Sequence, residues 1–177
     1  MSNNPNECEF KPLHIAVMTV SDSRTAANDT SGDTLVKLLT GAGHTLVEKR
    51  IVPDDIYQIR AVVSQWVADD DINAVITTGG TGITGRDSTP EAVKVLLDKE
   101  IEGFGEVFRA VSYEEIGTST IASRAVSGVA NATFIFCLPG STGACRTAWG
   151  KIISHQLDYR TRPCNLVELM PRVLEKA

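Results

Sequence analysis

Hydrophobic and polar positions along this chain follow two periods, one typical of buried strands and the other of amphipathic helices. Apolar or β-rich runs predict strands at residues 13–20, 45–52, 73–78, 125–129 and 133–138. The segment 45–52 is more polar and is expected nearer a sheet edge. Apolar residues three and four positions apart predict helices at residues 31–42, 56–67 and 144–157.

A further helix is expected after the strand at residues 73–78. Ser88 or Thr89 can cap it, Pro90 suits its first turn, and Glu91 stands in capping-box position to Ser88. Its predicted apolar face consists of Ala92, Val93, Leu96 and Leu97. The two glycines within residues 103–106 then predict a break, followed by a shorter helix that carries Val107, Phe108 and Val111.

Strands and helices alternate over most of the chain. This order predicts an α/β fold: a single three-layer, doubly wound domain with a mainly parallel sheet flanked by helices. We assign this domain to residues 13–165, with a flexible N-terminal tail at 1–12 and a C-terminal extension at 166–177.

Composition narrows the classes of function. The 177 residues carry a formal net charge of −5, which argues against a nucleic-acid partner. The four cysteines show no zinc-ligand spacing, and reduced thiols are expected. Residues 1–7 do not resemble a signal peptide, and no apolar run approaches the roughly 20 residues of a membrane span. We therefore predict a cytoplasmic protein without a membrane partner.

The most informative segment is a glycine-rich loop after the strand at residues 73–78. In doubly wound sheets, ligands bind beyond the carboxyl ends of the strands. Three strand-to-loop junctions therefore converge there, and we expect them to line one site. The residues assigned to this site are Ser21, Asp22, Thr78, Gly79, Gly80, Thr81, Gly82, Pro139, Gly140 and Ser141.

The loop fits neither standard phosphate-binding pattern. Gly80, Gly82 and Gly85 formally match GxGxxG, but that fingerprint belongs to the first strand–helix unit, and a dinucleotide-binding enzyme is the weaker alternative. Against the pattern GxxxxGK[ST], Arg86 stands at the lysine position and Asp87 at the Ser/Thr position. A purely structural turn is the other reading. The Asp87 carboxylate would repel an anion held by the loop amides unless a metal ion lay between them.

These residues resemble the MoaB/Mog family of molybdenum-cofactor biosynthesis proteins, which share the G-domain of gephyrin-like proteins. The family motif Thr-Thr-Gly-Gly-Thr-Gly is present at residues 77–82, and Arg-Asp-x-Thr-Pro-Glu follows at 86–91. The resemblance covers about residues 13–163. Further matching motifs lie at Ser21 and Asp22 and at residues 29–32, 52–54, 103–106 and 138–140.

The resemblance implies an α/β protein that binds molybdopterin and assembles as trimers or hexamers, with other cofactor-biosynthesis enzymes as possible partners. Active family members transfer AMP from Mg-ATP to the terminal phosphate of molybdopterin and release pyrophosphate. The carboxylates tied to this activity match Asp54 and Asp87, which are the expected catalytic residues and Mg²⁺ ligands. Arg86 and Glu106 are further candidates for substrate binding.

The expected chemistry needs no general base, because a phosphate monoester has a second pKa of about 6 and is already a nucleophile at neutral pH. Two departures from the family pattern leave an alternative open. Ser141 and Thr142 stand where Mog-type members have Asn-Pro, and Ser88 replaces a common valine. The alternative is a non-catalytic protein of the same pathway that binds molybdopterin and hands it on.

Overall fold

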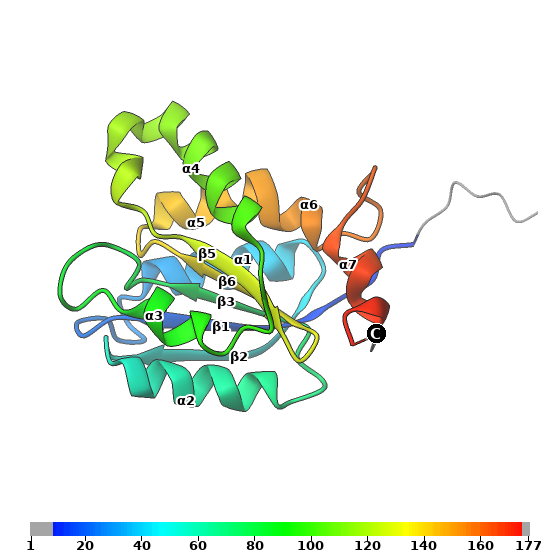
Figure 1. Cartoon of the computed structure of the whole chain (residues 1–177), viewed down its shortest axis with the longest axis horizontal. Helices are drawn as coiled ribbons and strands as arrows, with labels where there is room; N and C mark the ends of the chain where they lie inside the picture. Colours follow the sequence, from blue (N-terminus) through cyan, green and yellow to red (C-terminus); the bar gives the residue numbers. More distant parts are fainter. Residues whose placement is uncertain (1–8, 175–177) are drawn as a thin grey trace, which may run out of the picture.

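The computed structural model describes residues 9–174, and within this range six strands form one mixed sheet (Figure 1). Their order across the sheet is β2-β1-β3-β6-β5-β4. The strands are β1 (His14–Val20), β2 (Thr45–Val52), β3 (Ala74–Thr78), β4 (Lys99–Glu100), β5 (Val126–Ala130) and β6 (Thr133–Leu138). The predicted α/β architecture is therefore confirmed, and β4 is an addition that the sequence pattern did not indicate.

The sheet is parallel at its centre and antiparallel at one side. Strands β2, β1, β3 and β6 run parallel, whereas β5 pairs antiparallel with β6, and β4 pairs antiparallel with β5. Only Asn131 and Ala132 connect β5 to β6, both with positive φ, of 46° and 65°. A two-residue connection of this kind can only form a hairpin, which explains the antiparallel edge.

Helices cover both faces of the sheet and complete three layers (Figure 1). One face carries α1 (Thr30–Gly41), α4 (Glu102–Ile116), α5 (Thr142–Ala148) and α6 (Ser154–Gln156), and the other carries α2 (Ile56–Val67) and α3 (Thr89–Lys94). A π-helical turn, η2 (Trp149–Ile153), joins α5 to α6, so the helix predicted at residues 144–157 contains this irregularity. A 3-10 helix, η1 (Gly117–Ala122), continues α4.

Side-chain alternation along β1 shows how the layers are held together. Ile15 and Val17 belong to the core under α1, α4 and α5, while Ala16 and Met18 belong to the core under α2 and α3. All four are fully buried, as expected for a strand covered on both faces.

The predicted break at residues 103–106 is wrong, because these residues lie inside α4. Glycine inside a helix costs about 1 kcal/mol relative to alanine. Packing outweighs this cost here, because a Cβ on Gly105 would lie 2.7 Å from the Ala125 carbonyl oxygen, and Phe104 and Phe108 bury one face of the helix. Glycine therefore permits a close helix–strand contact and does not end the helix.

The predicted capping box is also wrong. Ser88 occupies the N-cap position of α3 but makes no capping hydrogen bond with its side chain, and its hydroxyl oxygen is buried without a partner among the described residues. The Thr89 hydroxyl instead donates to the Gly79 carbonyl at 2.9 Å, and so fastens the start of the helix to the glycine loop. Helix α3 then ends at Lys94, so Leu96 and Leu97 pack beyond it.

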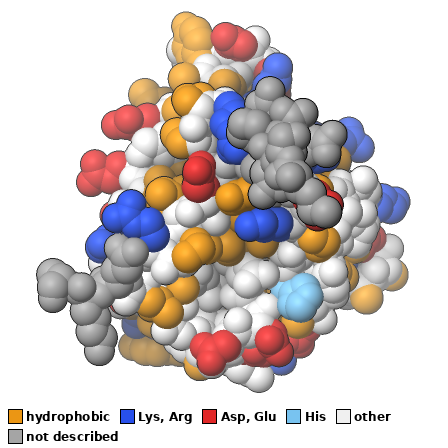
Figure 2. Space-filling model, turned by 90° about the vertical axis from the view of Figure 1, so that its right-hand side faces the viewer, with side chains coloured by type: hydrophobic (Ala, Val, Ile, Leu, Met, Phe, Trp, Pro, Cys, Tyr) orange, Lys and Arg blue, Asp and Glu red, His pale blue; other side chains and the backbone are white. Residues whose placement is uncertain are grey.

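The two ends of the described range, residues 9 and 174, lie at the opposite end of the molecule from the glycine loop (Figure 1). Residues 1–8 of the predicted tail and residues 175–177 of the predicted extension fall outside the described range. The rest of that extension forms α7 (Leu166–Leu169) and the 3-10 helix η3 (Met170–Arg172), and Val167 packs into the core. On the face that carries the two ends of the described range, basic side chains are interspersed with acidic and hydrophobic ones (Figure 2).

Candidate functional site

Three loops from the carboxyl ends of parallel strands meet at a cavity of about 600 Å³. Nine of the sequence-predicted residues line it: Asp54, Gly79, Gly80, Thr81, Gly82, Asp87, Pro139, Gly140 and Ser141. The cavity therefore brings together the loops after β3 and β6 and the loop after β2, which carries Asp54. The position agrees with the rule for open α/β sheets, whose ligands sit beyond the carboxyl ends of the strands.

The glycine loop adopts a backbone that only glycine takes easily at two positions. Gly79 and Gly80 have φ of 106° and 65°, and a Cβ on Gly79 would lie 2.2 Å from the Val20 carbonyl oxygen. The Gly79 N–H donates to the Leu138 carbonyl at 2.9 Å and is not free for a ligand. Among the described residues, by contrast, no hydrogen bond uses the N–H of Gly80 or of Thr81.

Arg124, which the sequence did not single out, holds this loop in place. Its guanidinium donates to the Gly82 carbonyl at 2.6 Å and to the Asp87 carbonyl at 2.8 Å, and it pairs with the Glu91 carboxylate. Its backbone N–H also donates to the Thr81 carbonyl at 3.0 Å. One side chain therefore fixes both ends of the segment between the glycines and Asp87.

Asp54 is locked to Asp22 by reciprocal hydrogen bonds. The N–H of each residue donates to the carboxylate of the other at 3.1 Å, although Asp22 itself does not line the cavity. Arg86 binds both oxygens of Asp22, at 2.9 and 2.7 Å. These bonds lower the pKa of Asp22, whereas burial and the neighbouring Asp22 carboxylate raise the pKa of Asp54. Arg86 thus neutralises Asp22 and does not line the cavity.

Asp87 caps its own loop. The hydroxyl and the N–H of Thr84 donate to one Asp87 oxygen at 2.6 and 2.9 Å, and these bonds hold the pKa of Asp87 below its ordinary value. Gly82 lies directly beneath this carboxylate, since a Cβ there would be 2.7 Å from an Asp87 oxygen. Gly80 lies in the same way beneath Asp54, at 3.2 Å. The two glycines leave room for both carboxylates at one end of the cavity.

Three other predicted residues do not line the cavity, and two of them, Ser21 and Thr78, have structural partners. The Ser21 hydroxyl accepts from the N–H groups of Ser23 and Arg24 at 3.2 Å, and the buried Thr78 hydroxyl donates to the Pro139 carbonyl at 2.9 Å. Glu106 lies on the exposed side of α4 and lines a separate cavity.

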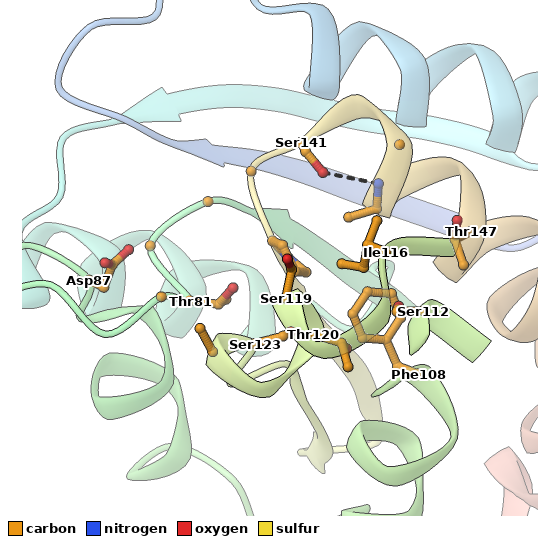
Figure 3. Close-up of a pocket in the computed structure, with 18 of the residues that line it drawn as sticks. Thr81, Asp87, Phe108, Ser112, Ile116, Ser119, Thr120, Ser123, Ser141 and Thr147 are labelled. Carbon is orange, nitrogen blue, oxygen red and sulfur yellow. Dashed lines mark hydrogen bonds between the residues drawn. The ribbon is translucent and has the colours of Figure 1, made fainter. Parts of the chain in front are cut away.

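Ser141, in contrast, lines the main cavity and also caps α5. Its hydroxyl accepts from the Ala144 N–H at 3.1 Å (Figure 3).

Sequence reasoning missed one wall of the cavity. This wall comes from α4, from η1 with the residue that follows it, and from α5. Figure 3 shows its members Phe108, Ser112, Ile116, Ser119, Thr120, Ser123 and Thr147, and Glu115 also lines the cavity on this side. The sequence indicated Phe108 only as an apolar helix residue, and Ser119, Thr120 and Ser123 lie in a segment with no clear periodicity. The continuation of α4 through residues 103–106 is what brings this segment over the cavity.

Residues 9–174 show no sign of a metal cluster or a membrane span. They contain no group of three or more His, Cys, Asp or Glu residues that could hold a metal ion. No helix in the described part of the chain is long and apolar enough to cross a membrane. The three cysteines described there, Cys137, Cys145 and Cys164, are free thiols.

The sheet order and the loop cluster define a doubly wound α/β protein with its ligand site at the carboxyl edge of the sheet. Residues 16–159 match the family described as "Probable molybdopterin binding domain". The Molybdenum cofactor biosynthesis protein B of Escherichia coli (strain K12) is 59% identical over 157 residues, which cover 89% of this chain and 92% of that protein.

Solved structures lead to the same family. A structure of Molybdenum cofactor biosynthesis protein B has a TM-score of 0.81 at 47% identity and covers 83% of this chain and 92% of its own. The tungsten cofactor synthesizing protein MoaB from Pyrococcus furiosus has a TM-score of 0.74 at 38% identity, with 82% and 92% covered. The chain therefore belongs to the MoaB/Mog family and is a protein of molybdenum-cofactor biosynthesis.

Proposed function

We propose that the protein binds molybdopterin and transfers AMP from Mg-ATP to its terminal phosphate. The observation that carries this proposal is the position of Asp54 and Asp87, which are 33 residues apart in sequence and line one cavity with the glycine loop. The free N–H groups of Gly80 and Thr81 are suitable donors for a phosphate oxygen.

The two carboxylates fit a magnesium ion. Mg²⁺ is commonly held by one or two carboxylates together with substrate phosphates, so a protein-only cluster is not required. The negative charges of Asp54 and Asp87 repel each other, and this repulsion contributes to the raised pKa of Asp54. A bound cation would neutralise this repulsion. When bound, the metal would neutralise phosphate charge during the transfer.

The proposed step is a displacement at the α-phosphorus of ATP. A terminal oxygen of the molybdopterin phosphate forms a bond to this phosphorus, the bond from the α-phosphorus to the bridging oxygen breaks, and pyrophosphate leaves with that oxygen. The nucleophile is already deprotonated near pH 7, since its second pKa is about 6. The loop amides and carboxylates therefore have to position two polyanions, and no proton acceptor is needed.

The test is incubation of the purified protein with molybdopterin and Mg-ATP. Adenylylated pterin and pyrophosphate should appear in equal amounts, and Asp54→Asn and Asp87→Asn should each lower the rate on the order of 100-fold or more. Asp70→Asn is the matched control, because Asp70 is exposed and lines a cavity away from the site. Pterin binding without product at any nucleotide concentration would contradict the proposed transfer.

A carrier protein that binds and hands on molybdopterin is the second candidate. It is favoured by the cavity lining, which contains Asp54, Asp87 and Glu115 but no Lys, Arg or His among the described residues. A carrier needs only neutral hydrogen-bond donors for the molybdopterin phosphate. An adenylyltransferase must in addition neutralise the negative charge of the nucleotide phosphates. Unchanged pterin binding and unchanged cellular cofactor production in Asp87→Asn would favour the carrier.

A further inference from the structure

The cavity extends well beyond the two carboxylates that the proposed transfer uses. Figure 3 shows Asp87 at one side, with Phe108 and Thr147 at the other. We call this second region the distal end; it is formed by Phe108, Ser112, Glu115, Ile116 and Thr147. A ligand with its phosphate at the glycine loop would place the remainder of its structure there.

Glu115 is the chemically distinctive residue of the distal end. Thr147, a residue of α5, is only 7% exposed. Its hydroxyl donates to Glu115 Oε2 at 2.7 Å. No Lys or Arg in the described range forms an ion pair with Glu115. Its carboxylate therefore keeps acceptor capacity for a ligand, since each ionised carboxylate offers about four lone-pair sites.

The position of Glu115 is not explained by helix stability. It lies in the last turn of α4, where the helix dipole favours positive charge and disfavours a carboxylate. The hydrogen bond to Thr147 alone would be served equally well by a neutral acceptor. A charged acceptor at this position is suited to a ligand that presents N–H donors.

We propose that Glu115 is a specificity-determining residue that binds the pyrimidine edge of the pterin, with Thr147 as its positioning residue. This inference rests on the proposed function, which supplies molybdopterin as the ligand. The 2-amino-4-oxo pyrimidine edge of a pterin offers a ring N–H and an amino N–H side by side, and one carboxylate accepts both. Exposed Ile116 supplies apolar surface for the ring, and buried Phe108 packs beneath this end of the cavity.

Glu115→Gln separates recognition of the ligand from a purely structural contact. The glutamine oxygen can still accept from Thr147, so the connection between α4 and α5 is retained, whereas the second acceptor oxygen and the charge are lost. Thr147→Val tests positioning, because it leaves the Glu115 carboxylate unrestrained. Glu114→Gln is the matched control: Glu114 is exposed in the same helical turn and does not line the cavity.

The measurement is the equilibrium binding of molybdopterin, 6-hydroxymethylpterin and 6-hydroxymethyllumazine, with ATP binding in parallel. The lumazine carries a carbonyl oxygen where the pterin carries its 2-amino group. The wild type should prefer the pterin by about 10- to 100-fold, and Glu115→Gln should lose this preference and weaken molybdopterin binding by a similar factor. ATP affinity should stay unchanged. Thr147→Val should have a molybdopterin affinity and a pterin preference between those of the wild type and Glu115→Gln. Glu114→Gln should match the wild type in both.

The outcomes separate this inference from the proposed function. If the wild type binds the pterin selectively but forms no adenylylated product, the transfer is overturned and the role of Glu115 stands. If transfer is intact but Glu115→Gln binds molybdopterin within about 3-fold of the wild type and keeps its preference for the pterin, the role of Glu115 is overturned alone. A wild type that does not discriminate pterin from lumazine also overturns it.

Discussion

The role of Arg124 in holding the glycine loop can be tested by removing its side chain. Arg124→Ala deletes hydrogen bonds to the carbonyls of Gly82 and Asp87, at 2.6 and 2.8 Å, and the ion pair with Glu91. A hydrogen bond from a charged donor contributes about 1.5–3 kcal/mol. The Arg124 side chain is 33% exposed, and water can replace part of each bond, so about 1 kcal/mol per carbonyl is the appropriate value.

The ion pair adds little to this sum. The Glu91 side chain is 50% exposed, and such pairs contribute less than about 1 kcal/mol. Arg124→Ala should therefore lower the free energy of unfolding by about 2–3 kcal/mol, or the melting temperature by about 4–12 °C for a domain of this size. Glu91→Gln removes the ion pair alone and should lower the free energy of unfolding by less than about 1 kcal/mol.

Urea unfolding at one fixed protein concentration measures both variants, because association would otherwise shift their apparent stability. Hydrogen exchange gives the local readout, and the hydrogen-bonded loop amides of Thr84 and Asp87 should exchange faster in Arg124→Ala than in Glu91→Gln. If Arg124→Ala is no less stable than Glu91→Gln and its loop amides keep their protection, Arg124 does not hold the loop.

Two further predictions concern residues whose environment is unfavourable in the folded state, Asp54 for its charge and Ala132 for its backbone conformation. Burial and Asp22 raise the pKa of Asp54, so its ionisation reduces stability progressively as the pH rises above 3.8, and fully above the folded-state pKa. Asp54→Asn should therefore raise the melting temperature by about 1–4 °C at pH 7, and this difference should disappear as the pH falls toward 3.8. Equal melting temperatures at pH 7 would contradict this. Ala132→Gly should relieve the positive φ of the β5–β6 turn and raise stability by about 0.5–1 kcal/mol in thermal unfolding, whereas Ala68→Gly, at φ −80°, should lower it.

The sequence predicted those elements whose local pattern agrees with their packing. Strands β1, β3 and β6 are continuous apolar runs buried on both faces, and α2 places Ile59, Val63 and Trp66 on one buried side. In these elements, periodicity and burial carry the same information. The prediction failed at residues 103–106, because the contact that requires Gly105 involves the distant Ala125 carbonyl.

The candidate site was predictable only where its residues belong to a recognisable motif. The glycine loop and Asp87 follow a strand directly, and the family resemblance adds Asp54. Arg124 and Glu115 have no such motif, because they act through contacts to Gly82 and Thr147 that lie 42 and 32 residues away. Sequence spacing alone contains no signal for contacts of this kind.

The distribution of charge connects these residues to the proposed reaction. Arg86 and Arg124 both make intramolecular contacts: Arg86 forms an ion pair with Asp22, and Arg124 donates to backbone carbonyls of the glycine loop. Neither lines the cavity, so Asp54, Asp87 and Glu115 line it without a protein cation among the described lining residues. A polyanionic substrate would have to enter such a cavity with its own counterion at the Asp54–Asp87 end, and would be bound by its N–H donors at Glu115. With a cation at the Asp54–Asp87 end, this arrangement would orient the proposed ligand, because its phosphate would be attracted to the cation and its N–H donors to Glu115.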